Sequence, residues 1–328
     1  MTTALVTGGT GFIGQHLVSA LVARHRKVRV LDRRPPVCAI SGVDYVSGSV
    51  LDADLVDETL RDAEEVYHLA GLPGMWLPNK DDFVAVNFKG TEIVIAAARK
   101  RGVARFLHCS TESILFRPTS PQESGGERSL LPPEQMPGVY TRSKMLAEQS
   151  AARAAAAGFP LVIGTPTMPI GPHDHNLTPP TAMLRQFLHG RIQIYLDFIV
   201  NMVDVRDVAD GLILTLERGQ VGQRYILGGE SISLKKILQL MTTISGHRTI
   251  AIPVPGKFAE ATAGLLEFIS DHITHRPPSG TAEGVRIALR ASELSIEKAQ
   301  RELGYAPRPI EPALRDTIVY LLSTPQAS

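Results

Sequence analysis

The sequence predicts an α/β protein with a doubly wound parallel sheet, and two observations support this fold class. Short apolar runs that are typical of buried strands alternate with helix-length segments through the first half of the chain. A glycine-rich turn directly follows the first of these runs. Strands that alternate with helices form βαβ units, and such units build a parallel sheet with helices on its faces.

Six short strands are expected in this half, and a loop and a helix-length segment follow each of them. The longest helical segment starts at Tyr140 and continues through an alanine-rich tract, which favours helix, until Gly158 provides a left-handed stop. Tyr140 is therefore expected in the first turn of that helix. The expected strands cover residues 4–6, 28–31, 45–46, 66–69, 105–108 and 161–163.

Beyond these strands the alternation stops. The proline-rich segment 165–172 is expected to be a loop that leaves the sheet to build a substrate lid, and a short helix should follow from about Thr181. Residues 203–210 indicate a strand end and a capped helix start, and residues 224–227 indicate another strand. After these segments helices dominate the chain.

Two regions are therefore expected. Residues 1–165, together with about 198–230, should form the domain that contains the parallel sheet. Residues from about 166 to 197 and from 231 to 328 should form a smaller, mostly helical region that binds the substrate.

The composition excludes several classes of partner. The 328 residues are 44% hydrophobic, which is enough for a sizeable core. The balance of 34 Lys and Arg against 33 Asp and Glu gives no electrostatic case for nucleic acid or an anionic membrane surface. Cys38 and Cys109 lack metal-ligand spacing and are expected to be free thiols in a reducing cytoplasm. His173 and His175 lack a clear third ligand, so no metal is expected. The sequence favours a small-molecule substrate.

Targeting and membrane signals are weak. The first strand-like run meets glycines at once, which leaves no room for a signal-peptide hydrophobic region. The apolar stretch Phe258–Ile269 contains Glu260 and Glu267 and is too short to span a bilayer. No integral membrane segment is expected; this stretch is interpreted as a core or subunit-contact helix, with surface attachment to a membrane as the alternative.

The glycine-rich turn is interpreted as a nucleotide site. Gly8, Gly11 and Gly14 follow a strand and open a helix, so the backbone can approach a pyrophosphate at the helix N-terminus. Asp32 ends the second strand about twenty residues later, where a carboxylate binds the ribose hydroxyls of NAD. Arg33 and Arg34 could instead hold the additional phosphate of NADP, and Asp32 could merely end a strand.

Tyr140 and Lys144 lie one helical turn apart and supply a proton donor and a charge that tunes it. An unperturbed phenol has a pKa of about 10. The positive charges of Lys144 and of an oxidised nicotinamide ring are expected to depress the pKa of Tyr140. A solvated helix face is the alternative interpretation of the pair.

Three motifs in order resemble those of the extended short-chain dehydrogenase/reductase, or NAD-dependent epimerase/dehydratase, family. They are the TGxxGxxG pattern of residues 7–14, the segment His68–Gly71, and the YxxxK pattern of residues 140–144. The resemblance covers nearly the whole chain and implies a Rossmann domain, an NAD(P)-dependent hydride transfer at a carbonyl or secondary alcohol carbon, and a catalytic triad. Thr111, Tyr140 and Lys144 match that triad, with Ser110 as the runner-up for the hydroxyl position.

The same resemblance assigns the cofactor-binding residues. Leu69, Ala70 and Gly71 match the loop that lies against the cofactor, and Asn87 matches a position that steadies the active site. Ser49 stands where the family usually has an acidic residue for the adenine amine. The complete predicted set is Gly8, Gly11, Phe12, Ile13, Gly14, Asp32, Arg33, Ser49, Val50, Leu69, Ala70, Gly71, Asn87, Ser110, Tyr140 and Lys144.

Within the family, the chain is similar to the hopanoid-associated sugar epimerases and to dihydroflavonol 4-reductase-like proteins. Met168 stands where nucleotide-sugar epimerases carry an Asn. Trp76 either adds apolar surface to the substrate pocket or packs the fold. Glu112 either acts as a general base, as in the dehydratases of this family, or is a strand-end carboxylate.

Three functions therefore stay open. The first is an NAD(P)-dependent reductase or dehydrogenase, the second an epimerase or dehydratase that retains NAD, and the third a non-catalytic nucleotide-sensing protein. The family also implies a homodimer formed by the helices of residues 84–101 and 140–157. The apolar stripe of Val84, Phe88 and Ile95 is compatible with that contact and with packing on the sheet.

Overall fold

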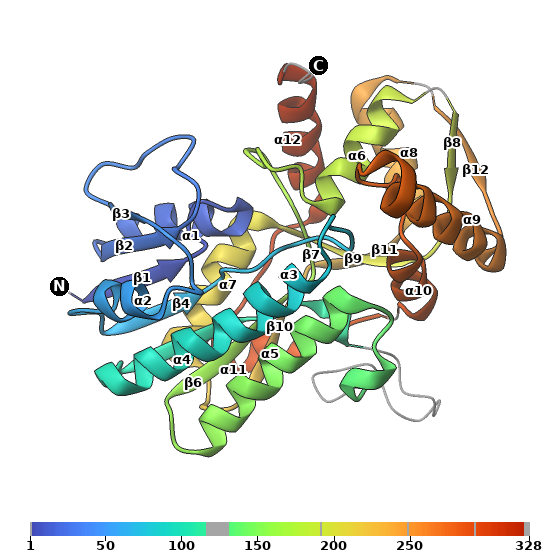
Figure 1. The fold of residues 1–328 in the computed structure, drawn as a ribbon. Helices are drawn as coiled ribbons and strands as arrows, with labels where there is room; N and C mark the ends of the chain where they lie inside the picture. Colours follow the sequence, from blue (N-terminus) through green and yellow to red (C-terminus); the bar gives the residue numbers. More distant parts are fainter. Residues whose placement is uncertain (1, 116–130, 191, 248, 292, 325–328) are drawn as a thin grey trace.

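A computed structural model describes residues 2–115, 131–190, 192–247, 249–291 and 293–324. Seven parallel strands form its main sheet, in the order β10-β6-β5-β4-β1-β2-β3 (Figure 1). The predicted doubly wound Rossmann sheet is therefore confirmed. The strands are β1 (Thr3–Thr7), β2 (Lys27–Asp32), β3 (Asp44–Ser47), β4 (Glu65–His68), β5 (Arg105–Cys109), β6 (Leu161–Pro166) and β10 (Arg224–Leu227).

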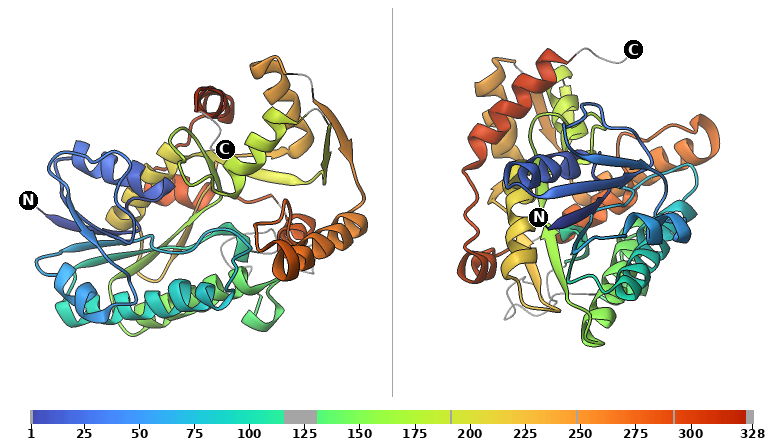
Figure 2. Two further views of the ribbon diagram at one scale, coloured as in Figure 1. Left: turned by 45° about the horizontal axis from the view of Figure 1, so that its top comes forward. Right: turned by 90° about the vertical axis from the view of Figure 1, so that its left-hand side faces the viewer.

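Helices cover both faces of this sheet (Figure 2). One face packs against α1 (Phe12–Ala23), α7 (Val205–Arg218) and α11 (Glu297–Leu303) through a cluster of buried aliphatic residues. The other face packs against helices that include α5, whose first turn contains Tyr140. These helices are α2 (Ala53–Thr59), α4 (Gly90–Arg101) and α5 (Val139–Ala156), with α3 (Asp81–Phe83) and the π-helical turn η1 (Val84–Lys89) leading into α4.

A second region stands beyond the carboxyl end of the sheet. Its core lies between α6, α8 and α12 and includes Phe187, Leu238 and Ile318. Two small sheets accompany these helices, with orders β11-β9-β7 and β12-β8. The elements are β7 (Met168–Ile170), α6 (Pro179–His189), β8 (Ile192–Tyr195), β9 (Ile199–Asp204), β11 (Glu230–Ser233), α8 (Leu234–Ser245), β12 (Ile250–Pro253), α9 (Gly256–Ile269), the π-turn η4 (Ser270–Thr274), α10 (Ala282–Arg290) and α12 (Ile310–Ser323).

Two sequence-based expectations are wrong. The proline-rich segment 165–172 is not a loop, because it contains the end of β6 and all of β7. Pro169 is tolerated because β7 is an edge strand of the small sheet. The helix over Phe258–Ile269 exists as part of α9. Ala263 is its only buried residue, so the core interpretation is wrong, while the subunit-contact interpretation and the membrane alternative stay predictions.

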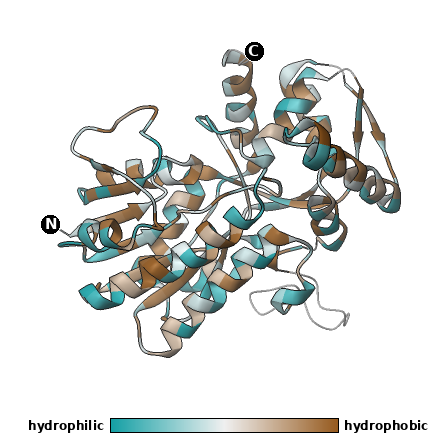
Figure 3. Cartoon of the chain, in the orientation of Figure 1, coloured by the Kyte–Doolittle hydropathy of each residue, from teal (hydrophilic) through white to brown (hydrophobic). Residues whose placement is uncertain are grey.

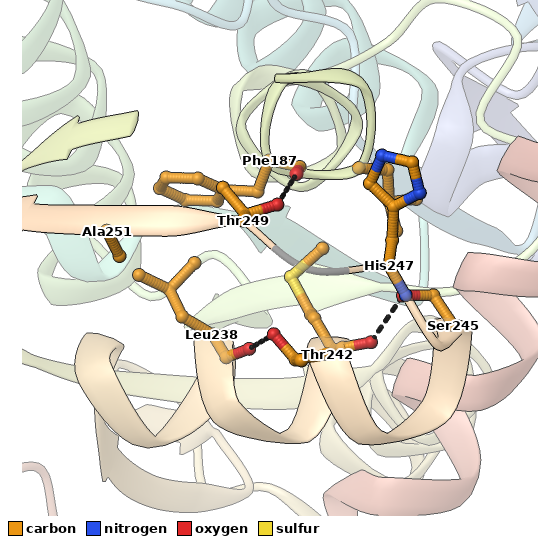
Figure 4. A pocket seen from close by; sticks show the side chains of 9 residues that line it. Phe187, Leu238, Thr242, Ser245, His247, Thr249 and Ala251 are labelled. Carbon is orange, nitrogen blue, oxygen red and sulfur yellow. Dashed lines mark hydrogen bonds between the residues drawn. The ribbon is translucent and has the colours of Figure 1, made fainter. Parts of the chain in front are cut away.

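A small cavity lies between α6, α8 and β12 (Figure 4). Phe187, Leu238 and Met241 line it together with polar residues that include Thr242 and His247. Its volume of about 20 Å³ admits no more than a water molecule. None of the predicted catalytic residues lines it, so it is not the substrate site.

Candidate active site

The glycine turn after β1 has the geometry that a dinucleotide requires. Gly8 has a φ of +73°, and a Cβ there would lie 2.7 Å from the backbone nitrogen of Ala70. A side chain at Gly14 would collide with the carbonyl oxygen of Gly8. Gly11 is the N-cap of α1, and a Cβ there would meet only the Gly8 oxygen, at 3.2 Å. The turn therefore leaves the start of α1 open to a pyrophosphate, and the residues fit the cofactor.

Asp32 lies at the carboxyl end of β2 and turns back toward this glycine turn. Its Oδ2 accepts a hydrogen bond from the Thr10 backbone at 3.1 Å. Arg34 donates to the side chain of Asn176 at 2.6 Å, whereas the exposed Arg33 side chain has no partner among the residues the structure describes. Asp32 is thus held beside the glycine turn, and both it and Arg33 are compatible with the predicted cofactor contacts.

Several predicted cofactor residues use their side chains for packing. Phe12 is buried and meets the ring of His16 edge-on at 5.8 Å, and Ile13 packs against the same core. Val50 is buried beside Gly90. The Ser49 hydroxyl accepts a hydrogen bond from the backbone of Leu51 at 3.2 Å. Any cofactor contact at Phe12 would therefore involve the backbone.

Asn87 connects the loop after β4 to the catalytic helix. It lies buried in the π-turn η1, and π-turns are frequent at functional sites. Its Oδ1 accepts from the Leu72 backbone at 2.7 Å, and its Nδ2 donates to Ser143 Oγ at 3.0 Å. A Cβ on Gly71 would lie 3.1 Å from the same amide oxygen. Through Asn87, these hydrogen bonds link the loop that contains Leu69 and Ala70 to Ser143, the residue before Lys144.

The predicted triad gathers where β5 and α5 meet. Lys144 Nζ donates to the carbonyl oxygen of Cys109, at the end of β5, at 2.9 Å. Thr111 starts a short 3₁₀ turn, and its hydroxyl both accepts from the Ser113 backbone and donates to the Ser113 hydroxyl at 3.2 Å. The ring of Tyr140 packs edge-on against Phe83 at 5.8 Å. All three residues are half-buried.

The electrostatics of this site differ from the expectation. Burial raises the pKa of Tyr140 to about 12; the Thr111 side chain lowers it, and the charges of Glu283, Cys109 and Glu112 raise it further. The expectation that Lys144 depresses this pKa is therefore wrong, and the part of the expectation that depends on an oxidised nicotinamide ring stays a prediction. The ammonium of Lys144 is directed at a backbone carbonyl instead, and its own pKa is lowered by burial.

Glu112 follows Thr111 and is not a solvated strand-end carboxylate. Loss of hydration raises its pKa to about 8, so its neutral form predominates at neutral pH. Among the described residues, no side chain or backbone N–H hydrogen-bonds its carboxyl group. It is a protonatable group beside the triad.

Ser110 turns away from the triad into the protein interior. Its hydroxyl donates to the carboxylate of Glu148, which also pairs with Arg224 on β10. Glu148 is only 2% exposed and lies one helical turn after Lys144. This buried ion pair connects β5, α5 and β10 behind the catalytic residues. Only the backbone of Ser110 is left to contact a cofactor.

Glu283 was missed by sequence reasoning; it lies in the second region and caps α5, the helix that contains Tyr140 and Lys144. Its carboxylate accepts from the Thr141 backbone and hydroxyl, both at 2.8 Å, and from the Tyr140 backbone at 3.3 Å. A side chain at Gly138 would collide with it. Gly138 is the N-cap of α5 and has no side chain that could accept from the first N–H groups of the helix. A glycine at this position therefore indicates that a residue from elsewhere in the chain accepts these hydrogen bonds.

The loop after β4 is also bound to the second region. The Trp76 indole donates to Asp271 at 2.7 Å, and Lys80 Nζ contacts Asp271 at 2.7 Å and Glu267 at 3.0 Å. Trp76 is thus half-buried with its N–H satisfied, which indicates a structural role for it. Sequence analysis gave no signal for the acidic partners, which lie far along the chain.

His173 and His175 lie beside Tyr320 on α12. The rings of His173 and Tyr320 are 5.5 Å apart, and the Tyr320 hydroxyl hydrogen-bonds His175 at 3.2 Å. The described residues contain no cluster of His, Cys, Asp or Glu that could hold a metal ion.

We expect Glu283→Gln to move the pH dependence of turnover. The negative charge of Glu283 raises the pKa of Tyr140, so removing it lowers that pKa. In the oxidative direction the rate should rise with pH as the phenolate forms, and this rise should occur at lower pH in the variant. Glu260→Gln is the control, because Glu260 pairs with Arg286 and does not contact α5. Identical profiles for all three proteins would contradict this role of Glu283.

The site combines a Rossmann sheet, an open glycine turn, Asp32 at the end of β2, and Thr111 after β5 beside Tyr140 and Lys144 of α5. This combination is typical of a nucleotide-dependent enzyme. The chain belongs to the NAD dependent epimerase/dehydratase family, whose model matches residues 4–228. NAD is therefore its cofactor. Within the described ranges, no helix is both long and apolar enough to cross a membrane.

Individual relatives align over almost the full chain. A protein of Synechocystis sp. (strain ATCC 27184 / PCC 6803 / Kazusa), provisionally named a dihydroflavonol 4-reductase, is 33% identical over 95% of this chain and 92% of its own length. A 4-hydroxy-2-methyl-3-oxo-4-farnesyl-3,4-dihydroquinoline-1-oxide ketoreductase of Stigmatella aurantiaca is 31% identical, with 92% and 91% covered. The crystal structure of gox2253 superposes with a TM-score of 0.83 at 30% identity and covers 98% of both chains.

Proposed function

We propose that this protein reduces a carbonyl group of a small molecule to a secondary alcohol, with Tyr140 as the proton donor. The observation that carries this proposal is the convergence of Tyr140, the Thr111 hydroxyl and Lys144 where β5 and α5 meet, with Lys144 Nζ 2.9 Å from the Cys109 carbonyl oxygen. A tyrosine phenol is protonated at neutral pH, and burial raises the pKa of Tyr140 further, to about 12. A reductase uses this protonated form, whereas an enzyme that oxidises an alcohol needs the phenolate.

Each residue of the triad has a separate task in this reaction. When bound, NAD in its reduced form supplies the hydride. Tyr140 donates its proton to the carbonyl oxygen as negative charge develops there, and the Thr111 hydroxyl holds the same oxygen in place. Lys144, anchored on the Cys109 carbonyl, binds the nicotinamide ribose and stabilises the phenolate that remains on Tyr140.

We infer that the substrate is largely apolar and lacks a sugar diphosphate. Met168 lies half-buried on β7 against the apolar core of the second region. A thioether there offers no hydrogen bond to a sugar or diphosphate, unlike the Asn that nucleotide-sugar epimerases carry. The names of the two relatives, a dihydroflavonol 4-reductase and a farnesyl-dihydroquinoline-oxide ketoreductase, support a bulky apolar ketone. Residues from about 166 to 197 and from 231 to 328 would form its binding region.

Glu112 favours a second candidate, a dehydratase. A carboxyl group with a pKa of about 8 is a good general base near neutral pH, and it lies next to the hydroxyl that holds the substrate oxygen. Glu112→Gln separates the two functions. A ketone reductase retains most of its activity in this variant, whereas a dehydratase loses its elimination step.

Nucleotide release and turnover test the proposal directly. We expect the purified protein to carry little bound nucleotide and to oxidise added NADH when acetophenone or a long-chain methyl ketone is supplied. Stoichiometric NAD released only on denaturation, with no ketone-dependent oxidation of NADH, would instead identify an epimerase. NADPH is compared in the same assay, because Arg33 is free to contact a ribose phosphate while Asp32 opposes it.

Two further proposals concern the oligomeric state and the cellular compartment of the protein. A homodimer would form through the outer faces of α4 and α5, where Glu92, Ala96, Arg99 and Arg153 border a shallow groove. A reducing cytoplasm suits the two cysteines, Cys38 at the surface and Cys109 in the core, which are both free thiols.

A further inference from the structure

The outer side of α9 is an exposed apolar face. Phe258, Leu265 and Phe268 follow one another at spacings of seven and three residues, which places them along one side of the helix. Ile273 continues the face in η4. The exposed fractions of these four side chains lie between 56% and 67%. Isolated apolar residues are common on protein surfaces, whereas a continuous row of them indicates an interaction site.

The acidic and basic side chains of α9 and η4 differ in their surroundings. Each acidic side chain is paired with a cation of another element: Glu260, which is 38% exposed, pairs with Arg286 at 2.7 Å, and the less exposed Glu267 and Asp271 both bind Lys80. Lys257 and Arg276 stand exposed at the two ends of the helical segment, and neither side chain has an ion-pair partner within the described ranges. The outer side is therefore apolar in the middle and cationic at both ends.

A second apolar surface lies at the same end of the molecule. In the two-stranded sheet, Ile192 pairs with Ile250 and Ile194 pairs with Ile252, so four isoleucines share one face. Their exposed fractions lie between 46% and 66%, while the intervening Gln193 is buried on the opposite face. Parallel sheets are normally covered on both sides. β12 leads directly into α9, and both surfaces lie at the end farthest from β3 (Figures 1 and 3).

We propose that this end of the protein binds the surface of a membrane that contains anionic lipids, with α9 lying in the plane of the interface. An amphipathic helix binds there by burying its apolar side chains while its flanking cations attract the lipid headgroups. The free cations at both ends of α9 favour this partner over a second copy of the chain, because a two-fold contact would bring four positive charges together. Glu267 of α9 and Asp271 of η4 bind the loop after β4 through Lys80 and Trp76, so attachment to a membrane would also fix the position of that loop.

Vesicle sedimentation tests this attachment without a catalytic readout. We expect the full-length protein to sediment with vesicles of equal parts phosphatidylglycerol and phosphatidylcholine, and more weakly with phosphatidylcholine alone. The triple variant Phe258→Ser/Leu265→Ser/Phe268→Ser should lose at least about tenfold in partitioning. Lys257→Gln/Arg276→Gln should lose about fivefold per cation on the anionic vesicles only.

The matched control is Val37→Ser/Val221→Ser, which removes two side chains of similar exposure, 65% and 55%, from the sheet domain. It should sediment like the wild type. Wild-type protein that stays in the supernatant with both vesicle types overturns the proposal, and so does a triple variant that sediments unchanged. Light scattering supplies a further test: a dimer that becomes a monomer in the triple variant, with vesicle binding unaltered, would assign this face to self-association.

Discussion

Tyr140→Phe is expected to reduce kcat by about 10²- to 10⁴-fold, the usual contribution of a positioned acid or base. The substitution removes one oxygen atom and leaves the ring packed edge-on against Phe83. Binding of NAD, measured by quenching of Trp76 fluorescence or by calorimetry, should change little, because the glycine turn and Asp32 are untouched. The expected loss is therefore in the chemical step.

Tyr305→Phe is the control for this measurement. It also removes a buried hydroxyl, which donates to the Gly228 carbonyl oxygen at 3.0 Å, but it lies outside the site. Its kcat should match that of the wild type, although the free energy of unfolding should fall by about 1 kcal/mol. Unchanged turnover in Tyr140→Phe with cofactor bound would exclude the triad as the catalytic group.

Glu148→Ala is expected to lower the free energy of unfolding by about 3–5 kcal/mol, because it removes the buried carboxylate that pairs with Arg224 and accepts from Ser110. The Arg224 side chain is 10% exposed, so water replaces the lost carboxylate poorly. The hydroxyl of Ser110 loses its acceptor in the same variant. Denaturant unfolding followed by circular dichroism measures the loss.

Two comparisons show whether the buried charge is the cause. The double variant Glu148→Leu/Arg224→Met removes both charges and should be clearly more stable than Glu148→Ala. Glu311→Ala breaks an exposed pair with Arg315 and should cost no more than about 1 kcal/mol. A Glu148→Ala protein as stable as Glu311→Ala would mean that the ion pair does not hold the three elements together.

The elements that sequence predicted well are those specified by local pattern. Periodicity placed the six N-terminal strands of the main sheet, and the spacing of Gly8, Gly11 and Gly14 marked the turn, because each feature depends on neighbours within a few residues. Segment 165–172 misled the prediction, since its prolines suggest a loop and only the pairing of β7 with β9 makes it a strand.

The pKa of Tyr140 could not be predicted from local sequence in the same way. A tyrosine and a lysine at helical spacing suggested a depressed pKa, but the pKa depends on the hydration of the hydroxyl and on charges that other segments bring. Burial and the carboxylates of Glu112 and Glu283 instead raise the pKa of Tyr140. The exposed face of α9 is a similar case, because composition alone does not reveal which side of a helix faces solvent.

By itself, the sequence determined the Rossmann sheet, the nucleotide turn and the helix that presents Tyr140 and Lys144, since short-range spacing encodes all three. The tertiary structure alone decided how that helix is held and how acidic its tyrosine is. The Glu283 carboxylate reaches the Thr141 backbone across 142 positions of the chain. Contacts between residues so far apart in the chain form only when the helices and sheets pack together, and no local sequence pattern specifies that packing.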